Sequence, residues 1–217
     1  MYGSLAFMRA LPGRRAELVE YVGRYRKPDW EPSKSHVPVA QLSGMIVNYM
    51  YELDRDSQEA IMLAVFDNRA AYERNAASPE QHERYLGYRA LLESDPEWHD
   101  GEITPFLSFG REQPVTGMYG TIARIRPSPG VRREIEAILA EWDEVVGPNV
   151  TGAIGTWLHW PDEERDVAYF AGMFESERSY WDHAQSQEQT ERYQGLRALL
   201  SADPEWHDGN IHAFRRF

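Results

Sequence analysis

The chain contains no cysteine among its 217 residues. It can therefore form neither a disulfide framework nor a thiolate site. Long apolar runs are absent too, because no stretch approaches the ~20 consecutive apolar residues of a membrane helix. No signal segment precedes the first predicted strand, which begins at Tyr2. These absences predict a cytoplasmic protein that does not insert into a membrane.

Positive charge is also scarce, with 23 Lys and Arg against 35 Asp and Glu, a formal net charge of −12. No basic cluster offsets this charge locally, so nucleic acid is not expected as a partner. Hydrophobic residues make up 42% of the chain and charged residues 27%, which are globular values. The 7 Trp and 12 Tyr suit either thick cores or an aromatic-lined cavity, and composition leaves both open.

One heptapeptide shows that the chain is a duplication. Asp-Pro-Glu-Trp-His-Asp-Gly occurs at 95–101 and again, unchanged, at 203–209. The opening segment also repeats, since 118–126 resembles 1–9 and a Pro-Gly pair follows each copy. Two domains of about 100 residues are therefore predicted, at 1–110 and 118–217, joined by a linker at 111–117.

The spacing between the copies falls from 117 residues (118 minus 1) at their start to 108 (203 minus 95) at the heptapeptide. The first copy therefore carries an insertion of 9 residues, which lies in the proline-containing segment Lys27 to Pro38. An insertion confined to one copy is either a lid or interface segment or a tolerated surface loop.

Hydrophobic periodicity predicts the same order of elements in both copies: strand, helix, strand, strand, helix, strand. Ser78 and Pro79 open the second long helix as N-cap and first helical residue, and that helix runs to about Leu92. The predicted strands are 1–9, 44–51, 60–66 and 103–108, and in the second copy 118–126, 152–159, 168–174 and 211–215.

This order is the ferredoxin-like pattern of the α+β class. Such a sheet carries helices on one face only, so its other face needs a partner, which a fused second copy supplies. The predicted fold is therefore two tandem ferredoxin-like repeats that pair their sheets into one α/β barrel. A ligand is expected in the space between the two sheets.

The repeated Trp-His-Asp suggests two interpretations. In one, Trp98, His99, Trp206 and His207 bind a ligand, with each His placed for proton transfer. In the other, the heptapeptide ends the helix, Gly101 takes a positive φ, and Trp98 plugs the end of the core. The motif is kept in both copies, which favours the structural interpretation. In an enzyme with one pocket built from a duplicated domain, the motif in the second copy is usually free to change.

Differences between the copies point to further candidates. Arg124 replaces Phe7 and could bind a carboxylate, phenolate or enolate, although an exposed strand position is the plainer interpretation. Asn48 is a second polar strand residue, replaced by Thr156 in the second copy. An aromatic ligand pocket is predicted from strand residues that would serve equally well as barrel core: Tyr49, Tyr51, Trp157, His159 and Tyr169.

The strand-Pro-Gly-helix opening, the hairpin that ends in Phe66 or Phe174, and the segment at His183 resemble the antibiotic biosynthesis monooxygenase domains of the dimeric α/β-barrel superfamily. In that family a His followed three residues later by Ser often lies after the third strand. His183 with Ser186 matches this motif, whereas Asn75 replaces the His in the first copy. Asn48 resembles the strand asparagine that some members of the family place beside the substrate.

The resemblance implies a cofactor-independent monooxygenase without a metal, in which a small aromatic phenol or enol reacts directly with O2. His183, Arg124 and Asn48 would be its catalytic residues. A non-catalytic barrel that binds a small apolar ligand, as a carrier, sensor or stress-linked accessory protein, is the alternative. A structural or interaction module is a third, and homo-oligomerisation stays open. Haem degradation is a minor option, because Tyr85 and Tyr193 stand where the family pattern needs a His.

Overall fold

The computed structural model describes residues 1–23, 44–106 and 117–216. The insertion from Lys27 to Pro38 and positions 111–116 of the predicted linker lie outside these residues. The chain divides into two compact units. Unit 1 comprises Met1–Asp100 and His212–Phe217, and unit 2 comprises Gly101–Ile211.

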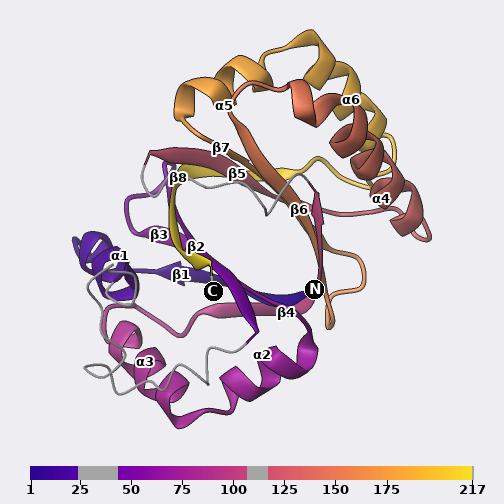
Figure 1. Cartoon of the computed structure of the whole chain (residues 1–217). Helices are drawn as coiled ribbons and strands as arrows, with labels where there is room; N and C mark the ends of the chain where they lie inside the picture. The colour runs from indigo at the N-terminus through magenta and orange to yellow at the C-terminus, as the bar shows by residue number, and fades with distance from the viewer. Residues whose placement is uncertain (24–43, 107–116, 217) are drawn as a thin grey trace. The chain divides into compact units, whose positions relative to one another are not determined.

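The first repeat contains the predicted order of elements, coloured indigo to magenta in Figure 1. Its strands and helices are β1 (Tyr2–Arg9), α1 (Arg15–Gly23), β2 (Met45–Leu53), β3 (Glu59–Phe66), α2 (Arg69–Ala76), α3 (Pro79–Arg89) and β4 (Glu97–Phe106). The predicted cap is confirmed, because the Ser78 side chain accepts a hydrogen bond from the Gln81 amide at 3.1 Å.

The second repeat contains the same order, with two short additions after its first helix. Its elements are β5 (Met118–Ile125), α4 (Arg132–Glu141), the π-helical turn η4 (Trp142–Val146), the 3₁₀ turn η5 (Gly147–Asn149), β6 (Ala153–Pro161), β7 (Ala168–Phe174), α5 (Glu177–Ala184), α6 (Gln187–Arg197) and β8 (Glu205–Arg216). The sequence pattern did not predict the two turns.

The eight strands form one closed antiparallel barrel in the order β1-β3-β2-β8-β5-β7-β6-β4. This confirms the predicted α+β fold of two ferredoxin-like repeats. The register is repeated as well, since Leu5 lies opposite Leu63 in the first copy and Ile122 lies opposite Ala171 in the second. In the described part of the chain, no helix has the length and apolar character needed to cross a membrane.

The repeated heptapeptide begins a strand, which corrects the prediction of a helix-ending turn. β4 starts at Glu97 and β8 at Glu205, several residues before the strands predicted there. Gly101 is not among the glycines with positive φ. A glycine is needed at this position because a Cβ would lie 2.0 Å from the carbonyl oxygen of Trp160, on the neighbouring strand β6.

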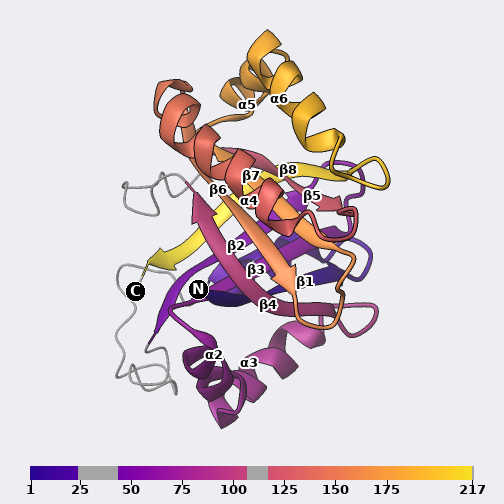
Figure 2. The ribbon, with the colours of Figure 1, turned by 90° about the vertical axis from the view of Figure 1, so that its right-hand side faces the viewer.

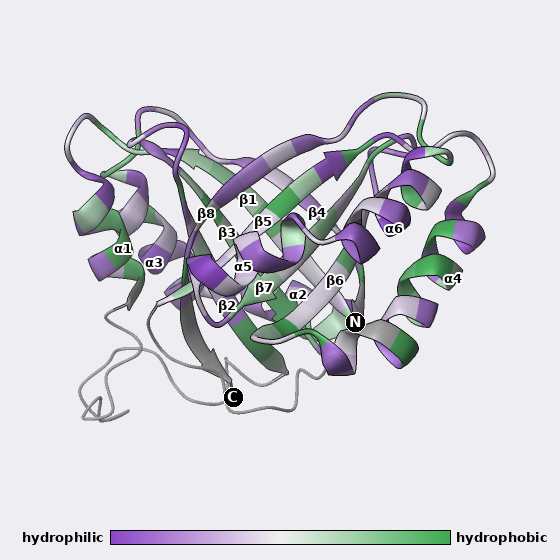
Figure 3. Cartoon of the chain, turned by 90° about the horizontal axis from the view of Figure 1, so that it is seen from above, coloured by the Kyte–Doolittle hydropathy of each residue, from purple (hydrophilic) through white to green (hydrophobic). Residues whose placement is uncertain are grey.

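Within each unit the helices cover one face of the sheet, as Figure 1 and Figure 2 show. In unit 1, Met8, Met50 and Met62 of the strands pack with Leu18 of α1 and Tyr88 of α3. In unit 2, the equivalent cluster joins strand residues to α4 and α6 through Ile135, Leu139 and Leu196. Hydrophobic and hydrophilic residues alternate along α4 in Figure 3, as expected for a helix with one buried side.

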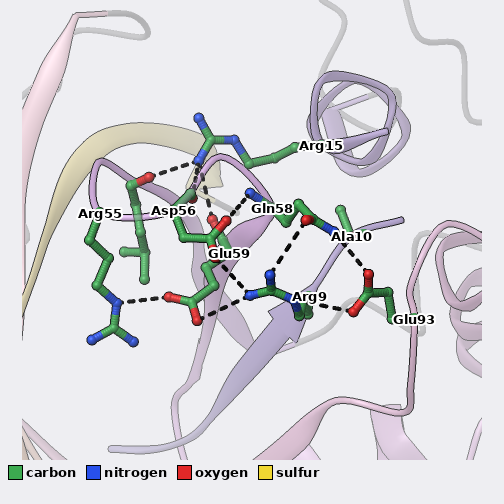
Figure 4. A network of polar contacts seen from close by, with 9 residues as sticks. Arg9, Ala10, Arg15, Arg55, Asp56, Gln58, Glu59 and Glu93 are labelled. Atoms are coloured by element: carbon green, nitrogen blue, oxygen red, sulfur yellow. Dashed lines mark hydrogen bonds and ion pairs between the residues drawn. The ribbon is translucent and has the colours of Figure 1, made fainter. Parts of the chain in front are cut away.

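A polar network holds the β2–β3 turn of unit 1 (Figure 4). Arg9 on β1 pairs with Asp56 at 2.8 Å and with Glu93 at 3.1 Å. Arg15 on α1 donates from Nη1 to the Leu53 carbonyl oxygen at 2.8 Å. These contacts tie the turn to the first strand and helix, at the sheet end where β2 finishes.

Candidate functional site

Each unit has a pocket between its sheet and the helices that cover it. The unit 1 pocket has a volume of about 500 Å³ and the unit 2 pocket about 370 Å³. Lining residues recur at equivalent positions of the two repeats, among them Phe66 and Phe174, Tyr72 and Tyr180, Arg84 and Arg192, Tyr85 and Tyr193, and Trp98 and Trp206. The duplication has therefore preserved a pocket as well as a fold.

A tyrosine–aspartate pair forms part of the wall in both units. The Tyr72 hydroxyl donates to Asp100 Oδ2 at 2.5 Å, and the Tyr180 hydroxyl donates to Asp208 Oδ1 at 2.8 Å. Burial, followed by the neighbouring carboxylate, raises the pKa of both tyrosines above the ordinary value. Each tyrosine therefore stays a neutral donor at physiological pH. Asp100 and Asp208 are the second aspartates of the two copies of the heptapeptide.

The local helix starts explain the position of these tyrosines. The Asn68 side chain accepts a hydrogen bond from the Ala71 amide at 3.0 Å, which caps α2. Ser176 and Ser179 form a capping box at the start of α5. Both caps set the helix phase so that the tyrosine in the first turn lies over the sheet.

The repeated Trp-His-Asp is divided between the two faces of the sheet. Trp98 and Asp100 line the unit 1 pocket, whereas His99 points to the opposite face, because successive side chains of a strand alternate. His99 is 6% exposed and meets the Phe7 ring edge-on at 5.4 Å. In unit 2, Trp206 lines the pocket and His207, 2% exposed, does not. The three residues of the motif do not share one site.

The exposure of the tryptophans corrects the idea that Trp98 plugs the core. Trp98 is 42% exposed and Trp206 is 38% exposed. By comparison, Trp157 is completely buried. Trp98 and Trp206 line the two pockets, and their contact with a ligand stays a prediction.

The predicted aromatic ligand residues lie on the sheet face that points away from the helices. Their neighbours in each strand pack under the helices, so alternation directs these side chains to the other face. All are at most 1% exposed, and none lines either of the two pockets: Tyr49, Tyr51, Trp157, His159 and Tyr169. Their contact with a ligand stays a prediction.

The three predicted catalytic residues do not come together in one of these pockets. Asn48 lines the unit 1 pocket and His183 lines the unit 2 pocket. Arg124 lies on the face away from the helices, where its Nη2 is 3.2 Å from Glu164 Oε2. His183 is therefore the predicted acid–base residue that the structure places beside an open cavity in unit 2.

His183 has an aromatic and cationic environment. Its ring centroid lies 5.9 Å from that of Trp142 and 5.4 Å from that of Phe174. Burial, followed by the charge of Arg192, lowers the pKa of His183 below its ordinary value. The imidazole is therefore neutral at physiological pH and can accept a proton. Asn75, which cannot accept one, occupies the equivalent position in unit 1 and is 5% exposed.

Arg192 and Trp142 were missed at the sequence level. The Arg192 guanidinium lies 3.9 Å from the centroid of the Trp142 ring, and both residues line the unit 2 pocket. Trp142 begins the π-helical turn η4, which extends α4 toward the pocket. The repetition of Arg and Tyr at 84–85 and 192–193 was a signal that could have identified the arginine.

Among the described residues, no three His, Cys, Asp or Glu side chains form a group that could hold a metal ion. The two pockets thus offer hydrogen-bonding groups, aromatic faces, a neutral imidazole and a guanidinium. This set can bind a planar ligand, accept a proton from it and stabilise negative charge on it.

No protein-family model matches the sequence, and no curated protein matches it. Solved structures share its fold across nearly the whole chain. A protein of Fusobacterium nucleatum named putative monooxygenase is 10% identical, with a TM-score of 0.75, and the match covers 99% of this chain and 92% of that one. An anthrone oxidase-like protein is 14% identical, with a TM-score of 0.64 and the same coverage.

A Listeria monocytogenes protein, described as an uncharacterized ferredoxin-fold protein related to antibiotic biosynthesis monooxygenases, is 9% identical, with a TM-score of 0.50. That match covers 99% of this chain and 95% of the other. Identities this low show a common fold and nothing finer. The chain therefore has the fold of the antibiotic biosynthesis monooxygenase-like proteins, as two tandem repeats.

Proposed function

We propose that the chain is a monooxygenase that oxidises a small aromatic phenol or enol in the unit 2 pocket, between sheet and helices. The observation that carries the proposal is the imidazole of His183 beside Trp142 and Phe174 in a cavity of about 370 Å³. The fold is shared with a protein named as anthrone oxidase-like, and an anthrone is the keto tautomer of an aromatic enol.

In the proposed reaction, His183 accepts the proton of the substrate hydroxyl, which leaves an electron-rich anion. The anion transfers electrons to O2, and a bond forms between a substrate carbon that bears hydrogen and one oxygen atom. The proton on His183 then passes to the peroxide. Loss of water breaks the O–O bond and converts that carbon to a carbonyl, so one oxygen atom is incorporated and the other leaves as water.

The other pocket residues would position the substrate and exclude water. Phe174 and Trp142 supply flat apolar faces for an aromatic ring. The cavity would keep the anion away from bulk solvent while it reacts. The proposal places the substrate under the helices, whereas the sequence had suggested the space between the sheets.

Oxygen uptake by the full-length chain, with phenols, naphthols and anthrones and without added flavin or metal, tests the proposal. His183→Asn is the informative variant, because it gives unit 2 the residue that unit 1 carries at position 75. A lost general base should lower kcat by roughly 100-fold. Asp182→Asn is the matched control, since that side chain is 74% exposed on the same helix, and it should leave kcat unchanged.

Binding without oxygen uptake for every compound would contradict the proposal and favour the carrier or sensor. Unchanged turnover in His183→Asn would instead remove the histidine from the mechanism. A thermal melt of each variant shows whether a loss of activity reflects unfolding.

A further inference from the structure

Arg192 carries a charge that no described acidic side chain neutralises. Among residues 1–23, 44–106 and 117–216 no carboxylate forms an ion pair with Arg192, and its side-chain hydrogen bond goes from Nη1 to Gln189 Oε1 at 3.3 Å. The guanidinium is half-buried in the pocket wall, and burial lowers the pKa of Arg192 to about 9. A half-buried cation without an anionic partner loses part of its hydration, so a ligand that supplies the anion would be favoured.

The equivalent arginine of unit 1 is satisfied differently. Arg84 donates from Nε to Gln81 Oε1 at 3.0 Å and from Nη2 to Asn75 Oδ1 at 3.4 Å. Two amide oxygens therefore hold Arg84 within its own wall. In unit 2 the asparagine is replaced by His183, which offers no amide oxygen, so Arg192 keeps one of these two acceptors.

The stacking of Arg192 keeps its hydrogen-bonding edge available. The guanidinium carbon lies 3.9 Å from the Trp142 ring centroid and 5.8 Å from that of Phe170. Stacking uses the flat face of the group, whereas its N–H groups lie in the plane and can bind two oxygens side by side. An aromatic ring with an anionic oxygen substituent matches this combination of flat apolar walls and a planar cation.

We infer that Arg192 is the anion-binding residue of the unit 2 pocket, and that the ligand of this pocket is a planar aromatic bearing a carboxylate or phenolate oxygen. This inference rests on the proposed function in one respect, since it takes the unit 2 pocket as the ligand site. It does not require that the ligand be oxidised there. It narrows the substrate to an aromatic that carries a carboxylate, or whose hydroxyl becomes a phenolate when His183 accepts its proton. It also assigns different preferences to the two pockets, since Arg84 is already engaged.

Binding to the full-length chain, measured by quenching of tryptophan fluorescence, tests the inference without requiring a reaction. The probes are 2-naphthoate and its neutral analogue 2-naphthamide, then 4-nitrophenol in its ionised form and neutral 4-nitroanisole. The wild-type chain should bind each anion more tightly than its neutral analogue. Arg192→Gln should weaken anion binding by roughly 10- to 100-fold and leave the neutral compounds nearly unaffected.

Two further variants decide the interpretation. Arg192→Lys keeps the charge and should retain the preference for the anion, which distinguishes charge recognition from a general loss of structure. Arg84→Gln is the matched change in unit 1 and should leave anion binding unchanged. The pair of probes that shows the larger difference in affinity between anion and neutral analogue identifies the anionic group as a carboxylate or a phenolate.

Equal affinity for anion and neutral analogue would overturn the inference, as would an Arg84→Gln effect as large as that of Arg192→Gln. Anion binding through Arg192 without oxygen uptake would support the inference while contradicting the monooxygenase. If Arg192→Gln leaves oxygen uptake unchanged, the monooxygenase proposal is supported and the role of Arg192 in anion binding is contradicted.

Discussion

At the residue scale, the face on which a side chain lies decides its role. The heptapeptide supplies Trp98 and Asp100 to a pocket and His99 to the opposite face of the same strand. The histidine is thus separated from the two residues that looked like its partners in sequence. A pocket wall accounts for the tryptophan in both copies, and a tight strand contact accounts for Gly101 in the first.

Alanine substitutions at two tryptophans should distinguish a pocket-wall residue from a core residue by the loss of stability that each causes. Trp98→Ala should lower the free energy of unfolding by ~1–2 kcal/mol, because 42% of the side chain is exposed. Trp157→Ala should cost ~3–5 kcal/mol, because that side chain is completely buried. Chemical denaturation measures both values. Equal losses from the two variants would contradict the assignment of Trp98 to an open wall.

At the scale of elements, the helix ends shape the two pockets. Side-chain caps start α2, α3, α5 and α6, so each helix begins at a defined residue. The π-helical turn after α4 adds Trp142 to the unit 2 pocket, whereas Tyr21 of α1 lines the unit 1 pocket. The two repeats thus obtain different walls from equivalent helices.

Gly87 in α3 and Gly195 in α6 occupy equivalent positions but have different surroundings. A Cβ at Gly195 would have nothing within 4 Å, whereas a Cβ at Gly87 would lie 1.8 Å from the Tyr21 hydroxyl oxygen. Gly195→Ala should therefore stabilise the protein by ~0.5–1 kcal/mol through helix propensity. Gly87→Ala should stabilise the protein less than Gly195→Ala, or destabilise it, because the Tyr21 ring must move.

Differential scanning calorimetry of the two glycine variants and the wild type measures this difference. Because Tyr21 lines the unit 1 pocket, Gly87→Ala should also alter ligand binding there. An equal rise in Tm for both variants would show that Tyr21 moves without cost.

At the scale of the whole molecule, the compact units do not follow the two halves of the sequence. β4 begins in unit 1 and continues in unit 2, and β8 begins in unit 2 and continues in unit 1. One consequence is a contact between residues far apart in the chain: His212 Nε2 lies 2.7 Å from Glu52 Oε2 in unit 1. Arg15 Nε approaches Glu52 Oε1 at 3.3 Å.

His212→Ala should lower the free energy of unfolding by about 1 kcal/mol at neutral pH. The hydrogen bond with His212 lowers the pKa of Glu52 below its ordinary value of 4.5. The stabilisation is therefore present above that value and is lost as pH falls through the pKa of folded Glu52. The difference between wild type and variant should shrink in acid, which urea unfolding at several pH values measures.

His212→Gln keeps a hydrogen-bond donor at this position and serves as the control. It should recover part of the stability at neutral pH. A loss in His212→Ala that does not change with pH would contradict a role for the ionised Glu52.

The sequence alone determined the duplication, the order of strands and helices and the fold class. These follow from local patterns, because periodicity, caps and Pro-Gly breaks act over a few residues, and an exact repeat needs no structure to be seen. The resemblance at His183 also directed attention to a residue that lines a pocket. The extent of β4 was not predictable in this way, because the need for glycine at position 101 comes from Trp160, far along the chain.

Only the tertiary structure decided which residues share a site. The approach of α5 and α6 to the sheet brings Tyr180, His183 and Arg192 to one pocket, while Arg124 lies on the other face. The absence of a carboxylate beside Arg192, among the described residues, is likewise a property of three-dimensional packing. Charge compensation depends on distance in space, and a pattern along one chain does not contain those distances.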